Sequence, residues 1–283
     1  YVPAEIANQI EFPPSLARLW HLRGYYGTLK HNVRGIYAYY LGWYDGNPAT
    51  LDELPPRVLA KKTLEYMGGV DIVIEKARDE FEQGNYRWIL HILNQVLWVN
   101  PENTPARELA AAAHTQLGYG AENATWRNAY LSAAMELTQG LPQVPKLHRV
   151  LRDVTRSMSV LHMLDALSIR LNATRAVNKA FTINWILSDS GEQSHSQLCN
   201  CVLNHRDGSA VEADATVTLT RAVIGQMSLE PLTIDQLLDL VESVAGNVQV
   251  VTELLGLLDH FPHWFPVATH DYKFEEKRGS ESE

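Results

Sequence analysis

The sequence predicts an α+β protein in which an all-α helical module over residues 1–145 precedes a smaller unit of antiparallel sheet and helices over residues 146–283. Two observations support this division. Apolar residues recur at helical spacing in the first half, whereas they alternate with polar residues between Phe181 and Leu219. Between the two patterns, residues 141–149 contain two prolines and no periodicity, which is typical of a domain boundary.

The first module is a series of helices separated by glycine and proline. Pro13-Pro14 divides two short N-terminal helices, and an aromatic, glycine-rich segment over residues 24–32 precedes a third helix. Asp45-Gly46-Asn47-Pro48 is a turn signal, and Trp43 and Asp45 are expected to shape that turn. In chain order the expected helices are 3–11, 14–23, 33–43, 56–67, 70–83, 85–99, 104–117 and 121–139.

A repeat occurs within these helices. Gly84-Asn85-Tyr86 is followed 34 residues later by Gly118-Tyr119-Gly120, and each glycine is interpreted as the turn between two helices. This period resembles the tetratricopeptide repeat, and the small residues Ala110 to Ala113 allow close helix packing. Two copies do not bury their own open ends, so packing and homodimerisation are the preferred interpretation. A peptide-binding scaffold is the alternative.

The second unit is expected to begin with an amphipathic helix over residues 153–174. Strands at 181–187, 195–203 and 211–219 follow as an antiparallel meander, with hairpin-like separators at 188–191 and 204–208. Cys199 and Cys201 are interpreted as two half-buried strand residues, too few for a zinc site. The remaining expected elements are helices at 220–227, 233–240 and 247–259, a short strand at 241–244, and a disordered tail at 275–283.

The composition excludes several functional classes. A formal net charge of −9 argues against nucleic acid as a partner, because phosphate binding needs a basic surface. No run of about 18 apolar residues is present, so no membrane span is expected. The start at Tyr1-Val2-Pro3 shows no signal peptide and reads as the interior of a longer protein.

Two long motifs resemble alkylsulfatases of the metallo-β-lactamase superfamily. The first runs from Arg23-Gly24-Tyr25-Tyr26-Gly27 through His31-Asn32-Val33-Arg34 to Asp45-Gly46-Asn47-Pro48. The second combines Gly84 to Trp88, Asn100-Pro101, Leu117-Gly118-Tyr119 and Ala124-Thr125-Trp126-Arg127. The resemblance implies a dimerisation domain followed by a sterol-carrier-protein-like C-terminal domain, with residues 1–48 against a catalytic domain. It also makes a periplasmic or secreted location an expectation.

The same resemblance implies hydrolysis of linear alkyl sulfates, such as dodecyl sulfate, to alcohol and sulfate by two zinc ions. The zinc motif of that family is H-x-H-x-D-H, and no H-x-H occurs in this sequence. A dinuclear site needs several ligands presented together. We therefore expect no metal or other cofactor in this chain, a zinc domain outside it, and no sulfatase activity from these residues alone.

His31 is the candidate catalytic residue, because the resemblance implies that this histidine contacts the sulfate. A histidine donates a hydrogen bond to a sulfate oxygen, and Arg34 lies roughly one helical turn further on. Tyr25 and Tyr26 are further candidates for substrate binding, with core packing as their alternative. For His31 the alternative is a packing or capping role at a helix start.

The second unit offers a competing function. Its apolar residues form either an ordinary core or a tunnel for an amphiphile, and the core is the preferred interpretation. A tunnel would make the chain a non-catalytic, dimeric module that binds lipids or other amphiphiles. The residues concerned are Trp185, Leu203, Met227, Leu237, Leu254, Leu257, Leu258 and Phe261.

Overall fold

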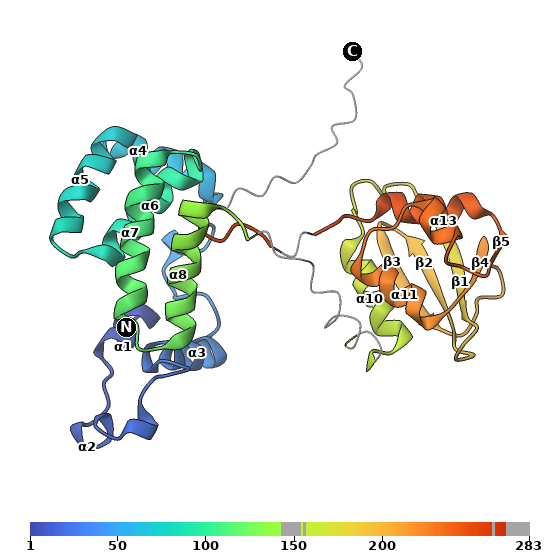
Figure 1. Cartoon of the computed structure of the whole chain (residues 1–283), viewed down its shortest axis with the longest axis horizontal. Coiled ribbons are helices and arrows are strands. Elements are labelled where there is room, and N and C mark those ends of the chain that lie inside the picture. Colours follow the sequence, from blue (N-terminus) through green and yellow to red (C-terminus); the bar gives the residue numbers. More distant parts are fainter. Residues whose placement is uncertain (143–153, 155–156, 262–263, 270–283) are drawn as a thin grey trace, which may run out of the picture. The chain divides into compact units, whose positions relative to one another are not determined.

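The structure is a computed structural model that describes residues 1–142, 154, 157–261 and 264–269. The chain forms two compact units (Figure 1). One contains Tyr1–Gln143 and Trp264–Glu283, and the other contains Val144–His263. The tail predicted at 275–283 lies outside the described residues, as does most of the boundary segment at 141–149.

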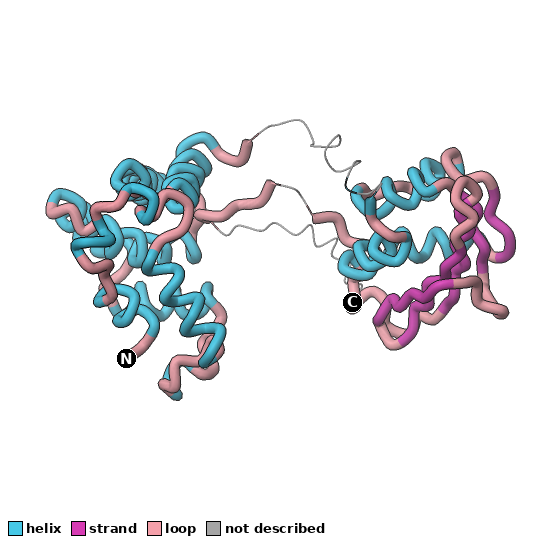
Figure 2. The backbone as a smooth tube through the Cα atoms, turned by 90° about the horizontal axis from the view of Figure 1, so that it is seen from below, coloured by secondary structure: helices cyan, strands magenta, loops and turns pink. Residues whose placement is uncertain are grey.

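The described part of the first unit contains helices and no strand, as its periodicity predicts (Figures 1 and 2). The prediction of one helix at 14–23 is wrong, because the α-helix there ends at Ala17 and a separate 3-10 helix forms at Trp20–Leu22. Its core lies between α4 and α8, where Leu93 and Val96 are fully buried and the alanines of α7 allow close contact between helices. Its elements are α1 (Pro3–Gln9), α2 (Pro14–Ala17), η1 (Trp20–Leu22), α3 (Leu29–Leu41), η2 (Pro48–Thr50), α4 (Pro56–Tyr66), α5 (Val70–Glu82), α6 (Tyr86–Val99), α7 (Thr104–Gly120) and α8 (Ala124–Gln139).

The two glycines of the repeat have different roles. Gly84 has a φ of 79° between α5 and α6, so it is the predicted turn glycine. Gly118 lies inside α7, and the prediction of a turn there is wrong. A Cβ at Gly118 would lie 2.7 Å from Leu131 Cδ2 on α8, so this glycine is required by the close approach of two helices.

The second unit confirms the predicted α+β class, because a five-stranded sheet packs with helices in it (Figure 2). The predicted antiparallel meander is wrong. The strand order is β3-β2-β1-β4-β5, and β1 pairs with β4 in parallel. The strands are β1 (Phe181–Leu187), β2 (Gln193–Cys199), β3 (Val202–Asp207), β4 (Ala215–Leu219) and β5 (Ser243–Gly246).

The predicted strand at 195–203 is two strands joined by a tight turn. Asn200 and Cys201 have φ values of 49° and 63°, the left-handed conformations of a two-residue hairpin turn. Cys199 therefore belongs to a strand, whereas Cys201 lies in the turn; both are half-buried free cysteines. Residues 211–214 precede β4, and Val211 is fully exposed despite its alternating pattern.

The helices whose bounds the structure describes in the second unit are α10 (Val160–Arg170), α11 (Arg221–Leu229), α12 (Ile234–Leu238) and α13 (Val248–Leu257). Residues 171–174, the last part of the helix predicted at 153–174, are not helical. The candidate tunnel residues belong to the core or its edge, with Trp185, Leu237 and Leu254 fully buried, although Phe261 is 48% exposed. Apart from Phe261, these side chains are packed in or against one hydrophobic core.

Candidate functional site

A loop over residues 23–28 places the first motif against the N-terminus of α8. The carbonyl oxygens of Tyr25 and Tyr26 accept hydrogen bonds from Ala124 N (2.8 Å) and Thr125 Oγ1 (3.1 Å). Gly24 is needed in this loop, because a Cβ would lie 2.7 Å from a carbonyl oxygen. The two matched motifs, far apart in the sequence, therefore form one structure.

His31 lies in the first turn of α3, which Thr28 caps by accepting a hydrogen bond from His31 N at 3.0 Å. The Nε1 atom of Trp126, on α8, donates to His31 Nδ1 at 2.6 Å. The two rings meet edge to face at 5.1 Å. Because Nδ1 accepts this bond, the proton of the neutral imidazole is on Nε2. His31 therefore has a fixed ring and one defined donor nitrogen.

A groove of about 1470 Å³ runs past this histidine, between the N-terminal segments and the ends of α7 and α8. Its lining includes four basic side chains and two acidic ones. One acidic residue, Glu122, is paired with Arg23. The apolar part of the lining includes Ile10, Phe12 and Leu22. An anion with an apolar tail fits this combination of charge and hydrophobicity. The charged residues are Arg23, Lys30, Arg34, Arg87, Glu11 and Glu122.

The predicted site residues are only partly brought together. His31 and Arg34 both line the groove. The side chains of Tyr25 and Tyr26 are not among its lining residues and are 42% and 83% exposed. Tyr25 lies edge to face with Trp20 and beneath the guanidinium of Arg23.

Asp45 has the predicted turn-shaping role. Its carboxylate accepts hydrogen bonds from Asn47 N and Thr50 Oγ1, each at 2.9 Å. These bonds stabilise the charged form and lower the pKa of Asp45.

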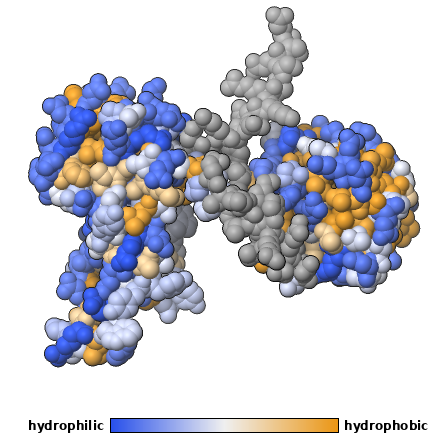
Figure 3. Space-filling model, in the orientation of Figure 1, coloured by the Kyte–Doolittle hydropathy of each residue, from blue (hydrophilic) through white to orange (hydrophobic). Residues whose placement is uncertain are grey.

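Apolar side chains also reach the surface of both units (Figure 3). Helix α3 has no buried residue, and a row of large side chains along it is solvent-exposed. This surface, which we call the α3 face, consists of Ile36 (59% exposed), Tyr39 (83%), Tyr40 (76%) and Leu41 (65%). Large apolar side chains gathered on one exposed helix are typical of an interface.

Sequence reasoning missed Trp126 and Arg87 as site residues. The sequence identifies Trp126 only as part of a motif. The side chain of Asn123 caps α8 by accepting a hydrogen bond from Trp126 N, which fixes the position of the Trp126 backbone. Nothing in this local pattern predicts where the indole points. Within the described residues, no group of three or more histidine, cysteine, aspartate or glutamate side chains is arranged to hold a metal ion. No helix in the described part of the chain is long and apolar enough to cross a membrane.

Two family models together match most of the chain. Residues 2–140 match the alkyl sulfatase dimerisation family, and residues 150–270 match the alkyl sulfatase C-terminal family. The chain is 44% identical to the alkyl/aryl-sulfatase BDS1 of Saccharomyces cerevisiae over 271 residues, covering 94% of this chain and 41% of that protein. A linear primary-alkylsulfatase of a Pseudomonas species is 38% identical over 275 residues, covering 95% and 40%.

The solved structure of the stereoselective inverting sec-alkylsulfatase Pisa1 from a Pseudomonas species is also similar. It matches with a TM-score of 0.80 and 38% identity, over 93% of this chain and 42% of that one. The chain thus spans about two fifths of the length of these relatives.

Proposed function

The chain belongs to the alkylsulfatase family, and from this premise we propose that it forms the part of an alkylsulfatase that dimerises the enzyme and contacts the substrate. The reaction is hydrolysis of linear alkyl sulfates of the dodecyl sulfate type to an alcohol and sulfate. The observation that carries the proposal is the histidine held by Trp126 at the edge of a basic groove with an apolar part.

In this proposal His31 Nε2–H donates a hydrogen bond to a sulfate oxygen. Charge on the ester develops as the C–O or S–O bond breaks, and a fixed donor stabilises that charge without reorganisation. Arg34 adds positive charge on the same helix and attracts the anionic head. The apolar side chains Ile10, Phe12 and Leu22 contact the alkyl chain.

The resemblance also implies two zinc ions, as expected for a metallo-β-lactamase-type hydrolase. The described residues lack a cluster of three metal-ligating side chains. We derive no step through the metal. Because the H-x-H-x-D-H motif does not occur in this sequence, we propose that residues outside it hold both ions.

The α3 face is the proposed site of association, either with a second copy of this chain or with the zinc-binding part of the enzyme. Ile36→Glu would place a charge on this face and disrupt the contact. If the chain sediments as a dimer that I36E converts to a monomer, the face is the homodimer interface. A dimer that I36E leaves intact excludes the face from the homodimer interface.

Substrate contact is tested by titrating the chain with octyl sulfate below its micellar concentration and recording the nitrogen–proton NMR spectrum. We expect the indole signal of Trp126 to shift with saturation, and R34Q to weaken binding severalfold. Trp88, which is half-exposed on α6 and outside the groove, is the internal control. Saturable shifts confined to the second unit would contradict the proposal and favour an amphiphile-binding role there.

A further inference from the structure

The final described segment, Trp264 to Thr269, follows the second unit in sequence but belongs to the helical unit. We call residues 264–269 the strap. Ala268 is only 7% exposed and is part of the helical core with residues of α6 and α7. Thr269 is 6% exposed. The second unit is therefore an insertion within the sequence of the helical unit.

One buried carboxylate anchors the strap. Glu136, on α8, is 5% exposed. It accepts backbone hydrogen bonds from Val267 (2.6 Å), Ala268 (3.1 Å) and Thr269 (3.0 Å), and a fourth from Thr269 Oγ1 (3.1 Å). Burying a carboxylate is costly unless donors surround it, and charged hydrogen bonds are about twice as strong as neutral ones. All four of these donors come from the strap.

Arg107, on α7, supports this arrangement from the other side. Its guanidinium donates to the carbonyl oxygens of Leu137 (3.1 Å) and Glu136 (3.5 Å). These bonds hold the end of α8, which carries Glu136, against α7.

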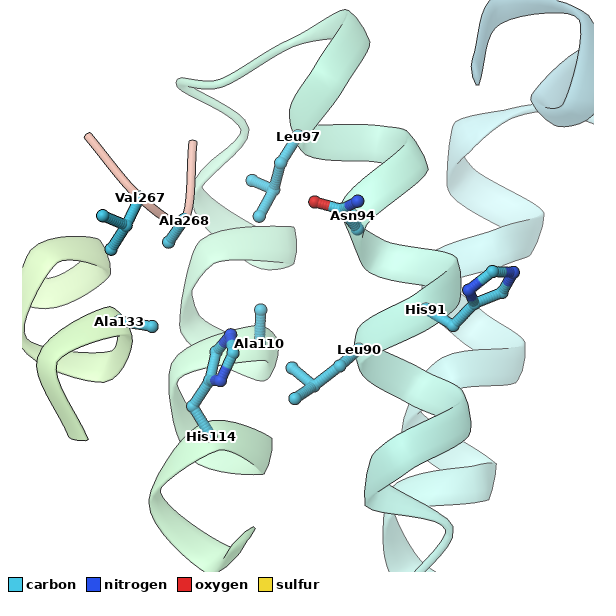
Figure 4. Close-up of a pocket in the computed structure, with 9 residues that line it drawn as sticks. All are labelled: Leu90, His91, Asn94, Leu97, Ala110, His114, Ala133, Val267 and Ala268. Atoms are coloured by element: carbon cyan, nitrogen blue, oxygen red, sulfur yellow. The ribbon is translucent and has the colours of Figure 1, made fainter. Parts of the chain in front are cut away.

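The strap also forms one wall of a cavity of about 280 Å³ between α6, α7 and α8 (Figure 4). Figure 4 shows Val267 and Ala268 beside Ala133 of α8, with His114 projecting from α7. The Nδ1 atom of His114 is buried and has no hydrogen-bond partner among the described residues. Removing the strap would open this wall.

The geometry points to a peptide-docking site on the helical unit, formed by Glu136 and occupied by the chain's own strap. The site recognises an uncharged segment whose bent backbone presents three successive N–H groups and a hydroxyl. The matched dimerisation domain, residues 2–140, lacks this segment, which lies within the residues matched to the C-terminal domain. The helical unit therefore includes residues 264–269, which the family match assigns to the C-terminal domain.

The test uses the full chain and hydrogen exchange measured by mass spectrometry. E136Q replaces one carboxylate oxygen by an NH2 group, which cannot accept hydrogen bonds from the strap N–H groups. The strap amides should therefore exchange at least tenfold faster. E108Q is the matched control, because Glu108 is exposed on the neighbouring helix α7. Unchanged protection of residues 264–269 in E136Q would overturn the inference.

A second variant changes the strap and leaves Glu136 intact. V267P removes the N–H of the shortest of these bonds, so strap exchange and modification of His114 by diethylpyrocarbonate should both accelerate. His162, exposed in the second unit, provides the reference rate. Slow exchange in α6 should persist, and an added peptide of the sequence Trp-Phe-Pro-Val-Ala-Thr should restore the protection of His114. Loss of α6 protection in both variants, or no change in either, would refute a docking site.

Discussion

Gly118→Ala tests whether this glycine is a turn residue or a contact between two helices. The added Cβ would lie 2.7 Å from Leu131 Cδ2, 2.8 Å from Leu131 Cγ and 3.4 Å from Tyr130 Cβ. Overpacking of this kind costs about 1–3 kcal/mol. Replacing glycine by alanine inside a helix contributes roughly 0.5–1 kcal/mol in the opposite direction. We expect a net loss of about 1 kcal/mol in the stability of the helical unit.

The sign of the effect should reverse when Leu131 is truncated. In an L131A background the clash is gone, so G118A should stabilise the unit by roughly 0.5–1 kcal/mol. The opening free energy of α7 amides, from native-state hydrogen exchange, measures both effects. Gly35→Ala is the control, since its Cβ meets nothing within 4 Å. A glycine with left-handed backbone would make alanine destabilising in both backgrounds, and that result would refute the contact.

Three further perturbations have defined outcomes. W126F removes the indole N–H that donates a hydrogen bond to His31, and such a bond contributes about 0.5–1.5 kcal/mol net. The kcat/KM of the enzyme should therefore fall roughly 2- to 13-fold. A loss above about a hundredfold would mean that the indole itself is catalytic. Gly246 has a φ of 84°, and its Cβ would lie 2.5 Å from the carbonyl oxygen of Asp214, so G246A should destabilise the second unit by about 2 kcal/mol or more. G256A, whose Cβ meets nothing within 4 Å, should not, and equal urea midpoints would contradict this account. Burial lowers the pKa of His114 from 6.5 to about 4. As the pH falls, the unfolded chain therefore binds a proton at His114 before the folded chain does. The stability of the helical unit should therefore fall by up to about 3 kcal/mol as pH drops from 6.5 to 4, whereas H114Q should lack this dependence in urea titrations at each pH.

The sequence predicts helices well because their signals are local. The apolar spacing of α6 and the Asn100-Pro101 stop lie within one element and are read directly. Gly118 was misinterpreted because a glycine after an alanine-rich helix fits a turn and a tight contact equally well. Only the position of Leu131 on the next helix distinguishes them.

The sheet order and the site depend on contacts between distant residues. The β2–β3 turn contains Asn200 and Cys201 without a glycine, so it carries no strong turn signal. The parallel pairing of β1 with β4 is non-local and leaves no trace in either strand's alternation. Likewise, His31 and Trp126 are 95 residues apart, so a motif match names both without placing one against the other.

Hydrolysis by the zinc-loaded enzyme that contains these residues tests the proposed role of His31 most directly. Release of inorganic sulfate from dodecyl sulfate should fall by roughly a hundredfold or more in kcat for H31A, the scale seen when a donor to developing charge is removed. H162A, which alters an exposed histidine of the second unit, should retain the wild-type rate. A wild-type kcat in H31A, with dimerisation and zinc content unchanged, would contradict a contact between His31 and the sulfate ester.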